Sequence, residues 1–206
     1  MRFSYRLVTL LARIPFLVLF RLKIVGLENV PRDGRLIIAA NHQSYLDPPL
    51  IGSTMPREIH FMAKASLFEK PLLGPLIRHL NSIPVTRSGQ DLASLRTAVR
   101  VLDSGGALLI FPEGTRSRSR QFLRATGGLG FLARQSGAPV LPVYIHGTRG
   151  ALRRLFRPGA VTMVVGQPIP PDEFPPEAEA GSAAHRALSQ YILDKIAELQ
   201  SALKHT

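Results

Sequence analysis

The sequence predicts an α/β fold, a single domain whose mixed, mostly parallel sheet is flanked by helices. The chain has 206 residues, 45% of them hydrophobic, which is enough for one substantial core. After Phe20, short apolar segments typical of strands alternate with longer segments of helical period. The 17 glycines and 17 prolines follow no period, which excludes a collagen-like chain.

The expected strands are short apolar runs bounded by turn residues. They cover Arg21–Val25, Leu36–Ala40, Ile59–Met62, Ile83–Val85, Ala107–Phe111, Val140–Ile145 and Val161–Val165. The expected helices cover Leu46–Ser53, Pro71–Leu80, Leu92–Leu102, Leu129–Gln135 and a final segment from about Ser182. Gly137 is expected to cap the fourth of these helices, and the proline-rich stretch Gln167–Gly181 to link the last strand to the last helix.

Residues 1–20 predict a membrane-associating amphipathic helix ahead of the domain formed by residues 21–206. Their longest uncharged apolar run, Ile14–Phe20, is far shorter than the roughly 18 residues of a spanning helix. On a helix, one stripe is polar and the opposite side is apolar. The stripe holds Arg2, Arg6, Thr9 and Arg13, and the apolar side holds Phe3, Leu7, Leu10, Leu11 and Ile14. The arginines are expected to meet anionic lipid phosphates.

Beyond Pro15, four apolar side chains are expected to dip into the acyl region of the bilayer. They are Phe16, Leu17, Leu19 and Phe20. The alternative is a helix packed against the core. A signal peptide is disfavoured because no small-residue cleavage site precedes Arg21.

The charge balance favours anionic partners. Twenty-six Lys and Arg against fourteen Asp and Glu leave a net charge of +12, which suits phospholipid head groups, nucleic acid or phosphorylated metabolites. The absence of cysteine excludes a disulfide scaffold, a thiolate nucleophile and Cys-ligated zinc. The histidines show no HExxH-type spacing, so no metal is expected.

The first candidate site follows the strand Leu36–Ala40, where the chain continues as NHQSYLD over residues 41–47. Ligand-binding crevices open at the carboxyl ends of strands in α/β folds. His42 is the candidate general base, and Asp47 can accept a hydrogen bond from its other ring nitrogen. The alternative is that both residues only cap local structure.

Three further blocks lie at strand ends: IPVTR over residues 83–87, FPEGTRS over 111–117 and VLPV over 140–143. With NHQSYLD they resemble, in the same order, the four blocks of the lysophospholipid acyltransferase family. The resemblance covers about residues 22–166 of the chain. It implies a glycerolipid acyltransferase-like fold, with residues 21–206 as the acyltransferase domain.

The resemblance implies transfer of a fatty acyl group from acyl-CoA or acyl carrier protein to the free hydroxyl of 1-acylglycerol 3-phosphate, giving phosphatidate. Because that hydroxyl attacks directly, no serine nucleophile is required. No cofactor or metal is implied. The expected location is monotopic, on the cytoplasmic face of the inner or plasma membrane, with the anionic membrane surface as a partner.

The substrate-binding residues that the resemblance implies are Lys64, Arg87, Glu113, Gly114, Thr115 and Arg116. Lys64 and Arg87 are expected to hold the acceptor phosphate, because an Arg fork can bind two oxygens and Lys adds a point charge. Glu113 is expected to contact the glycerol portion, with an ion pair to Arg116 or Arg87 as the alternative. Gly114 is a candidate to present backbone N–H groups to a substrate oxygen or the developing oxyanion.

Two positions depart from the family pattern: Asn81 stands where many members have glycine, and Gly127 where many have a basic residue. The acceptor therefore stays open, with a lyso-ornithine lipid or another lysophospholipid as the alternative. A basic run is a candidate for contact with coenzyme A phosphates, acyl carrier protein or anionic lipid; it comprises Arg116, Arg118, Arg120 and Arg124. A non-catalytic basic protein is disfavoured, and no nucleic acid partner is expected, because the chain has no Trp and only four Tyr.

Overall fold

The computed structural model describes residues 1–86, 92–119, 121–157, 159–176 and 181–204. Within these ranges, seven strands form one sheet in the order β1-β7-β6-β2-β5-β3-β4. They are β1 (Lys23–Val25), β2 (Leu36–Ala40), β3 (Ile59–Lys64), β4 (Ser82–Val85), β5 (Ala107–Ile110), β6 (Val140–His146) and β7 (Thr162–Val165). Neighbouring strands are parallel except β6 and β7. The predicted mixed, mostly parallel sheet is confirmed.

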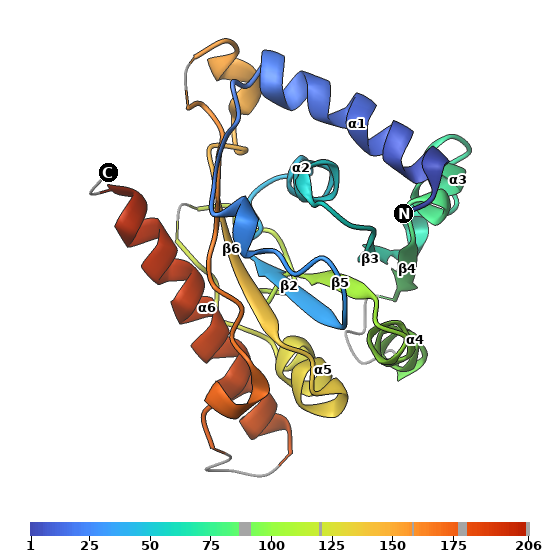
Figure 1. The fold of residues 1–206 in the computed structure, drawn as a ribbon, viewed down its shortest axis with the longest axis vertical. Helices are drawn as coiled ribbons and strands as arrows, with labels where there is room; N and C mark the ends of the chain where they lie inside the picture. The colour runs from blue at the N-terminus through green and yellow to red at the C-terminus, as the bar shows by residue number, and fades with distance from the viewer. Residues whose placement is uncertain (87–91, 120, 158, 177–180, 205–206) are drawn as a thin grey trace.

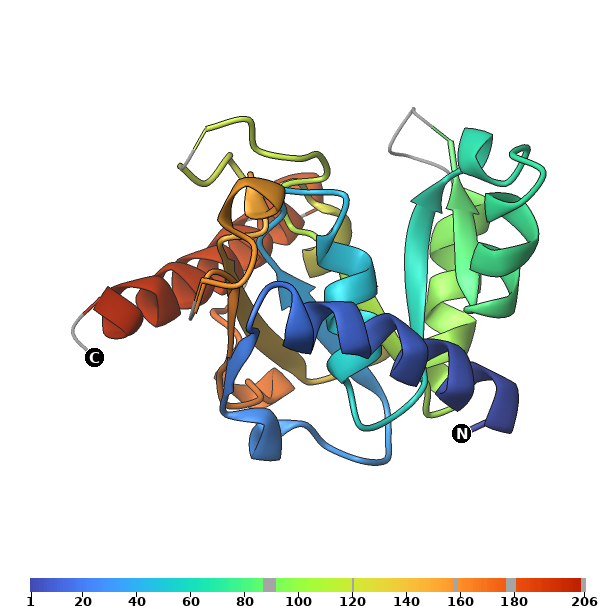
Figure 2. The same cartoon turned by 90° about the horizontal axis from the view of Figure 1, so that it is seen from above.

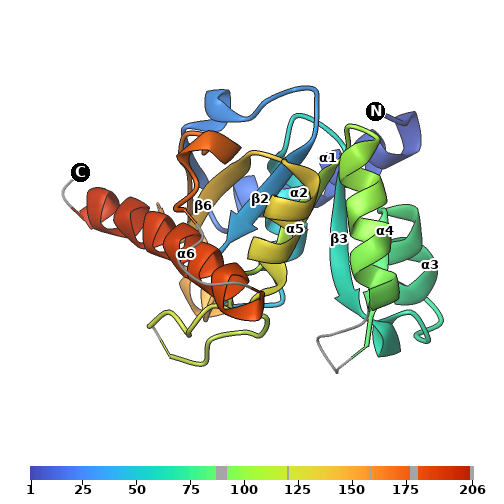
Figure 3. The same cartoon turned by 90° about the horizontal axis from the view of Figure 1, so that it is seen from below.

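Helices cover both faces of the sheet (Figure 1). They are α1 (Phe3–Val18), α2 (Asp47–Thr54), α3 (Leu73–His79), α4 (Leu92–Asp103), α5 (Gly128–Ser136) and α6 (Ser182–Lys204). One buried cluster joins α1 and α2 to the sheet, and a second joins α4, α5 and α6 to its opposite face. Figure 3 shows this second layer, in which α5 and α6 lie side by side.

The β2 strand explains why both faces need covering. All five of its residues are buried, and successive side chains point to opposite faces. Leu36 and Ile38 join the cluster with α1 and α2, whereas Ile37 and Ala39 join the cluster with the other helices. A continuous apolar run of this kind is typical of a central parallel strand.

The expected strands and helices are all present, with their ends shifted by a few residues. β3 continues to Lys64, and Gly137 caps α5 in the left-handed conformation at φ 58°. The stretch expected to be a linker is partly bound to the sheet, because Ile169 and Val140 exchange backbone hydrogen bonds of 2.8 and 2.9 Å. Residues 177–180 of that stretch lie outside the described ranges.

The inner face of α1 belongs to the core. Tyr5 and Phe16 are buried on this helix, and Phe20 is buried just after it. The prediction that Phe16 and Phe20 enter a bilayer is wrong, because Pro15 lies inside α1 and the helix turns both rings toward the sheet and α2. The alternative of a core-packed helix is correct for this face.

The outer face of α1 is apolar and exposed. Its large exposed apolar side chains are Phe3, Leu7, Leu10, Leu11, Ile14, Leu17 and Val18. In the described part of the chain, no helix is both long and apolar enough to cross a membrane. The contact of this face with a membrane surface stays a prediction.

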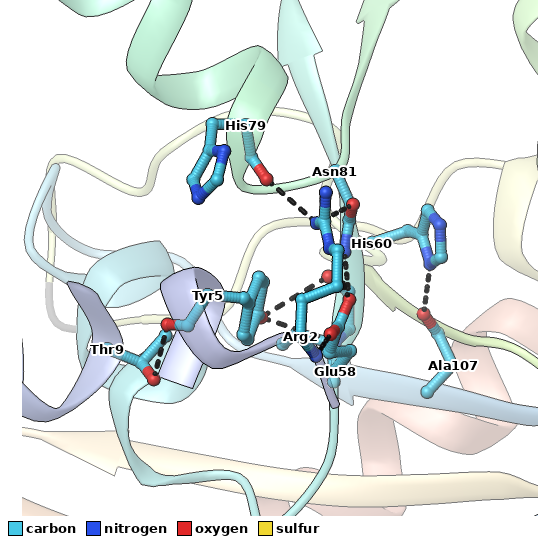
Figure 4. Close-up of polar contacts among 9 residues, drawn as sticks. Arg2, Tyr5, Thr9, Glu58, His60, His79, Asn81 and Ala107 are labelled. Carbon is cyan, nitrogen blue, oxygen red and sulfur yellow. Dashed lines mark hydrogen bonds and ion pairs between the residues drawn. The ribbon is translucent and has the colours of Figure 1, made fainter. Parts of the chain in front are cut away.

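A polar cluster holds the start of α1 against the amino ends of β3 and β4 (Figure 4). The Arg2 guanidinium donates to the His79 carbonyl at 2.9 Å and to Asn81 Oδ1 at 2.5 Å, and it pairs with the Glu58 carboxylate at 3.3 Å. The Tyr5 hydroxyl lies within 3.4 Å of the Ile59 carbonyl and 3.3 Å of its N–H. Arg2 is therefore bound by the domain and is removed from the stripe expected to meet lipid phosphates.

The backbone conformation of Asn81 explains why asparagine can stand at a position where many members of the family have glycine. Its φ of 61° is left-handed, a conformation that glycine adopts freely and asparagine tolerates. The side-chain amide donates to Glu58 Oε2 at 3.1 Å, which a glycine could not do. Asn81 therefore forms the turn into β4 and also helps to hold α1.

Candidate active site

The candidate site lies where parallel strands end. β2, β5 and β3 are neighbours and run in one direction, so the segments that follow them meet at a single edge of the sheet. Figure 2 shows the segments after β2, β5 and β6 gathered there, in light blue, yellow-green and orange. This is the edge at which α/β proteins commonly bind ligands.

His42 and Asp47 are in direct contact. His42 Nδ1 lies 2.9 Å from Asp47 Oδ2, and this same oxygen accepts the N–H groups of Gln43 and Ser44, each at 2.7 Å. An ionised carboxylate only accepts hydrogen bonds, so beside it a neutral imidazole would carry its proton on Nδ1 and leave Nε2 as the acceptor. The pair therefore has the tautomer that a general base requires.

The Asp47 side chain turns back toward the preceding loop. It lies in the first turn of α2, yet no side chain caps this helix, and the Asp47 carboxylate is fully buried. Its hydrogen bonds fix residues 42–44 and the imidazole, so the capping interpretation does not describe it. Asp47 Oδ1 is buried and has no partner among the residues described.

Phe111 holds the imidazole from the side. Its ring stacks on His42 with centroids 3.9 Å apart and planes 13° from parallel. The His42 side chain keeps 15% of its surface exposed, so it is oriented by Phe111 and Asp47 but still accessible. The sequence signal for Phe111 is its position directly after β5, where it opens the FPEGTRS block two residues before Glu113.

Glu113 joins the loop after β5 to the loop after β2. Its Oε1 accepts the His42 backbone N–H and its Oε2 accepts the Leu123 N–H, both at 2.9 Å. The Ser117 N–H donates to the His42 carbonyl at 2.8 Å, so the two loops are tied twice. Burial raises the pKa of the Glu113 carboxyl, although the two backbone N–H groups oppose this. This geometry favours a positioning role for Glu113, and its contact with the glycerol portion of the acceptor stays a prediction.

The other expectations for this loop have mixed outcomes. No ion pair found among the described residues joins Glu113 to Arg116. The Gly114 N–H is not free for an oxyanion, because it donates to the Phe111 carbonyl at 3.0 Å in a turn with φ of 66°. Thr115 is exposed. The Arg116 guanidinium lies over the Tyr45 ring at 3.5 Å from its centroid, which brings the FPEGTRS and NHQSYLD blocks together.

Lys64 lies at the carboxyl end of β3, exposed and paired in register with Val85 of β4. Its ammonium is therefore available on the same edge of the sheet as His42. Arg87, two residues after Val85, lies outside the described residues, as does Arg120 of the basic run. The roles of Lys64 and Arg87 toward a phosphate stay predictions.

Two features of the site escape the sequence analysis. Asn41 is buried and joins β2 to β6, because its amide oxygen accepts the Ile145 N–H at 2.7 Å and its amide nitrogen donates to the Ile145 carbonyl at 2.9 Å. A pocket of about 510 Å³ opens beside the loop that follows β2. Its lining includes Gln43, Tyr144, His146, Arg149, Arg154 and Gln200.

No group of three or more metal-ligating His, Asp or Glu side chains is found in the part of the chain that the structure describes. The polar groups at the site are one imidazole, two buried carboxylates that accept hydrogen bonds from backbone N–H groups, and exposed cationic side chains. This set suits proton transfer and anion binding.

Residues 21–146 match the family model described as Acyltransferase. The chain is 30% identical to the 1-acyl-sn-glycerol-3-phosphate acyltransferase of Bacillus subtilis over 88% of its own length and 89% of that protein. It is 26% identical to the chloroplastic enzyme of that name from Arabidopsis thaliana, of which it spans about half (49%). Among solved structures, the 1-acyl-sn-glycerophosphate acyltransferase PlsC from Thermotoga maritima is similar, with a TM-score of 0.74 and 29% identity over 95% of this chain and 79% of that one.

Proposed function

The chain belongs to the acyltransferase family, and from this premise we propose that it transfers a fatty acyl group from a thioester donor to the free hydroxyl of 1-acylglycerol 3-phosphate, giving phosphatidate. The names of its relatives support this acceptor. Acyl-CoA and acyl carrier protein are the two donors to be compared. The observation that carries the proposal is the His42–Asp47 contact of 2.9 Å, which leaves Nε2 of an accessible imidazole unprotonated.

His42 Nε2 acts as the general base. It removes the proton from the acceptor hydroxyl as the oxygen attacks the thioester carbonyl carbon and forms the new C–O bond. The imidazolium that results is stabilised by Asp47, whose carboxylate is held by two further N–H donors. When the C–S bond breaks, the imidazolium returns its proton to the departing thiolate, and His42 is neutral again.

The other named residues prepare this step. Phe111 and Asp47 fix the imidazole plane, and Glu113 fixes the backbone that carries it. Orientation of this kind lowers the entropic cost of reaching the transition state. Lys64 and Arg87 are assigned to the acceptor phosphate, and Arg116 and Thr115 to the substrate at the mouth of the site.

The direct test is acyl transfer by the purified protein. The wild type is incubated with acyl-CoA or acyl carrier protein thioester and a panel of lyso-acceptors, including 1-acylglycerol 3-phosphate and lyso-ornithine lipid, and the product is identified by mass spectrometry. We expect His42→Ala to lower kcat by about 100- to 10,000-fold. Asp47→Asn is also expected to lower kcat strongly, because an uncharged amide no longer stabilises the imidazolium.

His79→Ala is the matched control. His79 precedes β4 and therefore lies at the sheet edge opposite the candidate site, where its carbonyl binds Arg2 (Figure 4). The control should keep wild-type turnover. Near-wild-type activity of a folded His42→Ala protein would show that this imidazole is not the base.

The phosphate assignment is tested with two acceptors. Lys64→Ala should weaken use of 1-acylglycerol 3-phosphate by about ten- to hundredfold while sparing a neutral monoacylglycerol, because only the former loses a charge-assisted hydrogen bond. Arg87→Ala should behave in the same way. Lys70→Ala removes an exposed lysine from the neighbouring segment and serves as the control. Equal losses for the two acceptors would mean that Lys64 does not bind the phosphate.

A further inference from the structure

The connection between β6 and β7 combines positive charge with exposed apolar side chains. We call residues 147–157 the arginine loop. It contains Arg149, Arg153, Arg154 and Arg157 together with the exposed Leu152, Leu155 and Phe156. No Asp or Glu occurs in the sequence between Glu113 and Asp172, so no neighbouring acid offsets this charge locally. The proposed reaction assigns no task to this loop.

One arginine holds the loop together and three are left outside. The Arg154 guanidinium donates to the Gly147 carbonyl at 2.7 Å and to the Arg149 carbonyl at 3.0 Å. Ala151 is buried and anchors the short helical turn Ala151–Arg154 in the core. Arg149, Arg153 and Arg157 are exposed, and none of them forms an ion pair with another described residue.

The exposed apolar residues of the loop are large. Leu152 keeps 72% of its surface exposed and Phe156 keeps 60%. Exposed side chains of this size, surrounded by arginines, are typical of a surface that meets a partner with both an apolar and an anionic part. A bilayer of anionic lipid presents both parts within a few ångströms of each other.

The loop continues the exposed face of α1. The Phe156 N–H donates to the Leu19 carbonyl at 2.6 Å, directly after α1 ends. Figure 1 shows the loop, in orange, at the end of α1 that leads into β1 and at the same margin of the molecule. The apolar side of α1 and the apolar residues of the loop can therefore meet one surface together.

We propose that the arginine loop is a second membrane contact, beside α1. Leu152 and Phe156 enter the interfacial region of the bilayer, while Arg149, Arg153 and Arg157 bind lipid phosphates. This inference rests on the proposed function insofar as the acceptor is a lipid that stays in the bilayer. An acidic protein would match the arginines but would leave the exposed Leu and Phe unexplained.

The arginine loop also lines part of the pocket beside His42. Arg149, Gly150 and Arg154 of the loop form one wall of the 510 Å³ pocket, and Gln43, next to His42, forms another. A loop seated on the bilayer therefore brings this opening to the lipid surface. The acceptor can then approach His42 without leaving the membrane.

The test uses sedimentation of the full-length protein with vesicles of phosphatidylcholine, with or without phosphatidylglycerol. Arg153→Gln/Arg157→Gln removes two exposed charges that do not line the pocket. Each arginine near an anionic surface adds roughly fivefold to binding, so the pair should weaken binding to anionic vesicles about 25-fold and leave neutral vesicles unaffected. Leu152→Ser/Phe156→Asn should weaken binding to both vesicle types. Asn suits position 156 because its φ is 62°.

The control is Arg96→Gln/Arg100→Gln, which removes two exposed arginines from α4 on the opposite layer. Thermal unfolding checks that every variant is folded. Vesicle binding by the arginine-loop variants that falls no further than the control would overturn the inference. Loss of binding to acyl carrier protein with vesicle binding kept would also overturn it, because the arginines would then serve the donor.

Activity on detergent-dispersed acceptor separates this inference from the proposed function. If the Arg153→Gln/Arg157→Gln variant no longer sediments with anionic vesicles but keeps its activity on detergent-dispersed acceptor, the loop is a membrane contact. If the variant stays on vesicles and detergent activity persists, the loop assignment fails and the proposed function stands. If the wild type transfers no acyl group in detergent, the proposed function fails whatever the vesicle result.

Discussion

At the scale of single residues, the hydrogen bonds accepted by two carboxylates define the geometry of the site. Asp47 Oδ2 receives three donors, and this fixes both the imidazole tautomer and the loop that carries the imidazole. Glu113 fixes the backbone of two loops, because its carboxylate accepts the N–H groups of His42 and Leu123. Two carboxylates therefore act on one histidine, one through its ring and one through its main chain.

Glu113→Gln tests the positioning role. One amide nitrogen would face a backbone N–H that now donates to a carboxylate oxygen, and an unsatisfied buried donor costs about 1–3 kcal/mol. We expect a corresponding decrease in the free energy of unfolding and a lower kcat with KM little changed, measured by urea unfolding and steady-state kinetics. Glu69→Gln makes the same change at an exposed carboxylate and should alter neither. A raised KM with unchanged stability would instead favour direct contact of Glu113 with the acceptor.

His60 gives the stability a dependence on pH. Burial lowers the pKa of His60 from its ordinary value of 6.5, although the Ala107 carbonyl at 3.3 Å from Nδ1 opposes this (Figure 4). A lowered pKa means that the unfolded chain takes up the proton first, so stability is lost as the pH falls below the unfolded value. His60→Gln should make the urea midpoint vary less than in the wild type between about pH 7 and pH 5. An unchanged pH dependence would show that His60 titrates normally.

At the scale of elements, α1 has two faces with different tasks. Tyr5 and Phe16 anchor it in the core, and Arg2 fixes its start against Glu58 and Asn81. Its opposite face exposes leucines and an isoleucine. Deleting residues 1–20 would therefore open the core as well as remove the proposed membrane contact, so point variants separate the two effects better.

Leu10→Gln/Leu11→Gln/Ile14→Gln should release the protein from neutral and anionic vesicles without lowering its thermal stability. All three side chains are exposed, and burying each in a bilayer is worth roughly tenfold in binding or more. Phe16→Ala should do the reverse, costing about 3–5 kcal/mol of stability while membrane binding by the folded protein persists. Leu92→Gln, at an exposed leucine of α4, is the control for sedimentation. Unchanged sedimentation of the triple variant would place the membrane contact elsewhere.

At the scale of the whole molecule, the two layers differ in what they offer to a surface. One layer carries α1 and, at its margin, the arginine loop, whereas the other carries α4, α5 and α6 (Figures 1 and 3). The candidate site opens at the edge between them, where the parallel strands end (Figure 2). If the proposed membrane contacts form, the net charge of +12 would attract the protein to an anionic membrane and the exposed apolar residues would orient it there.

The sequence by itself determined the elements, the class of fold and the family. Hydrophobic periodicity and turn residues are local, and they predicted each strand and helix to within a few residues. The four blocks were also readable, because each occupies a few consecutive residues at a strand end. His42 and Asp47 are five residues apart, so even their contact could be predicted from the sequence.

Only the tertiary structure decided which distant residues meet. Arg2 pairs with Glu58 across 56 residues, Glu113 accepts the His42 N–H across 71, and Asn41 joins Ile145 across 104. Both the inward turn of Phe16 and Phe20 and the approach of Phe156 to Leu19 depend on how α1 packs over the sheet. No local pattern encodes these pairs, because the order of the strands and the packing of the helices bring them together.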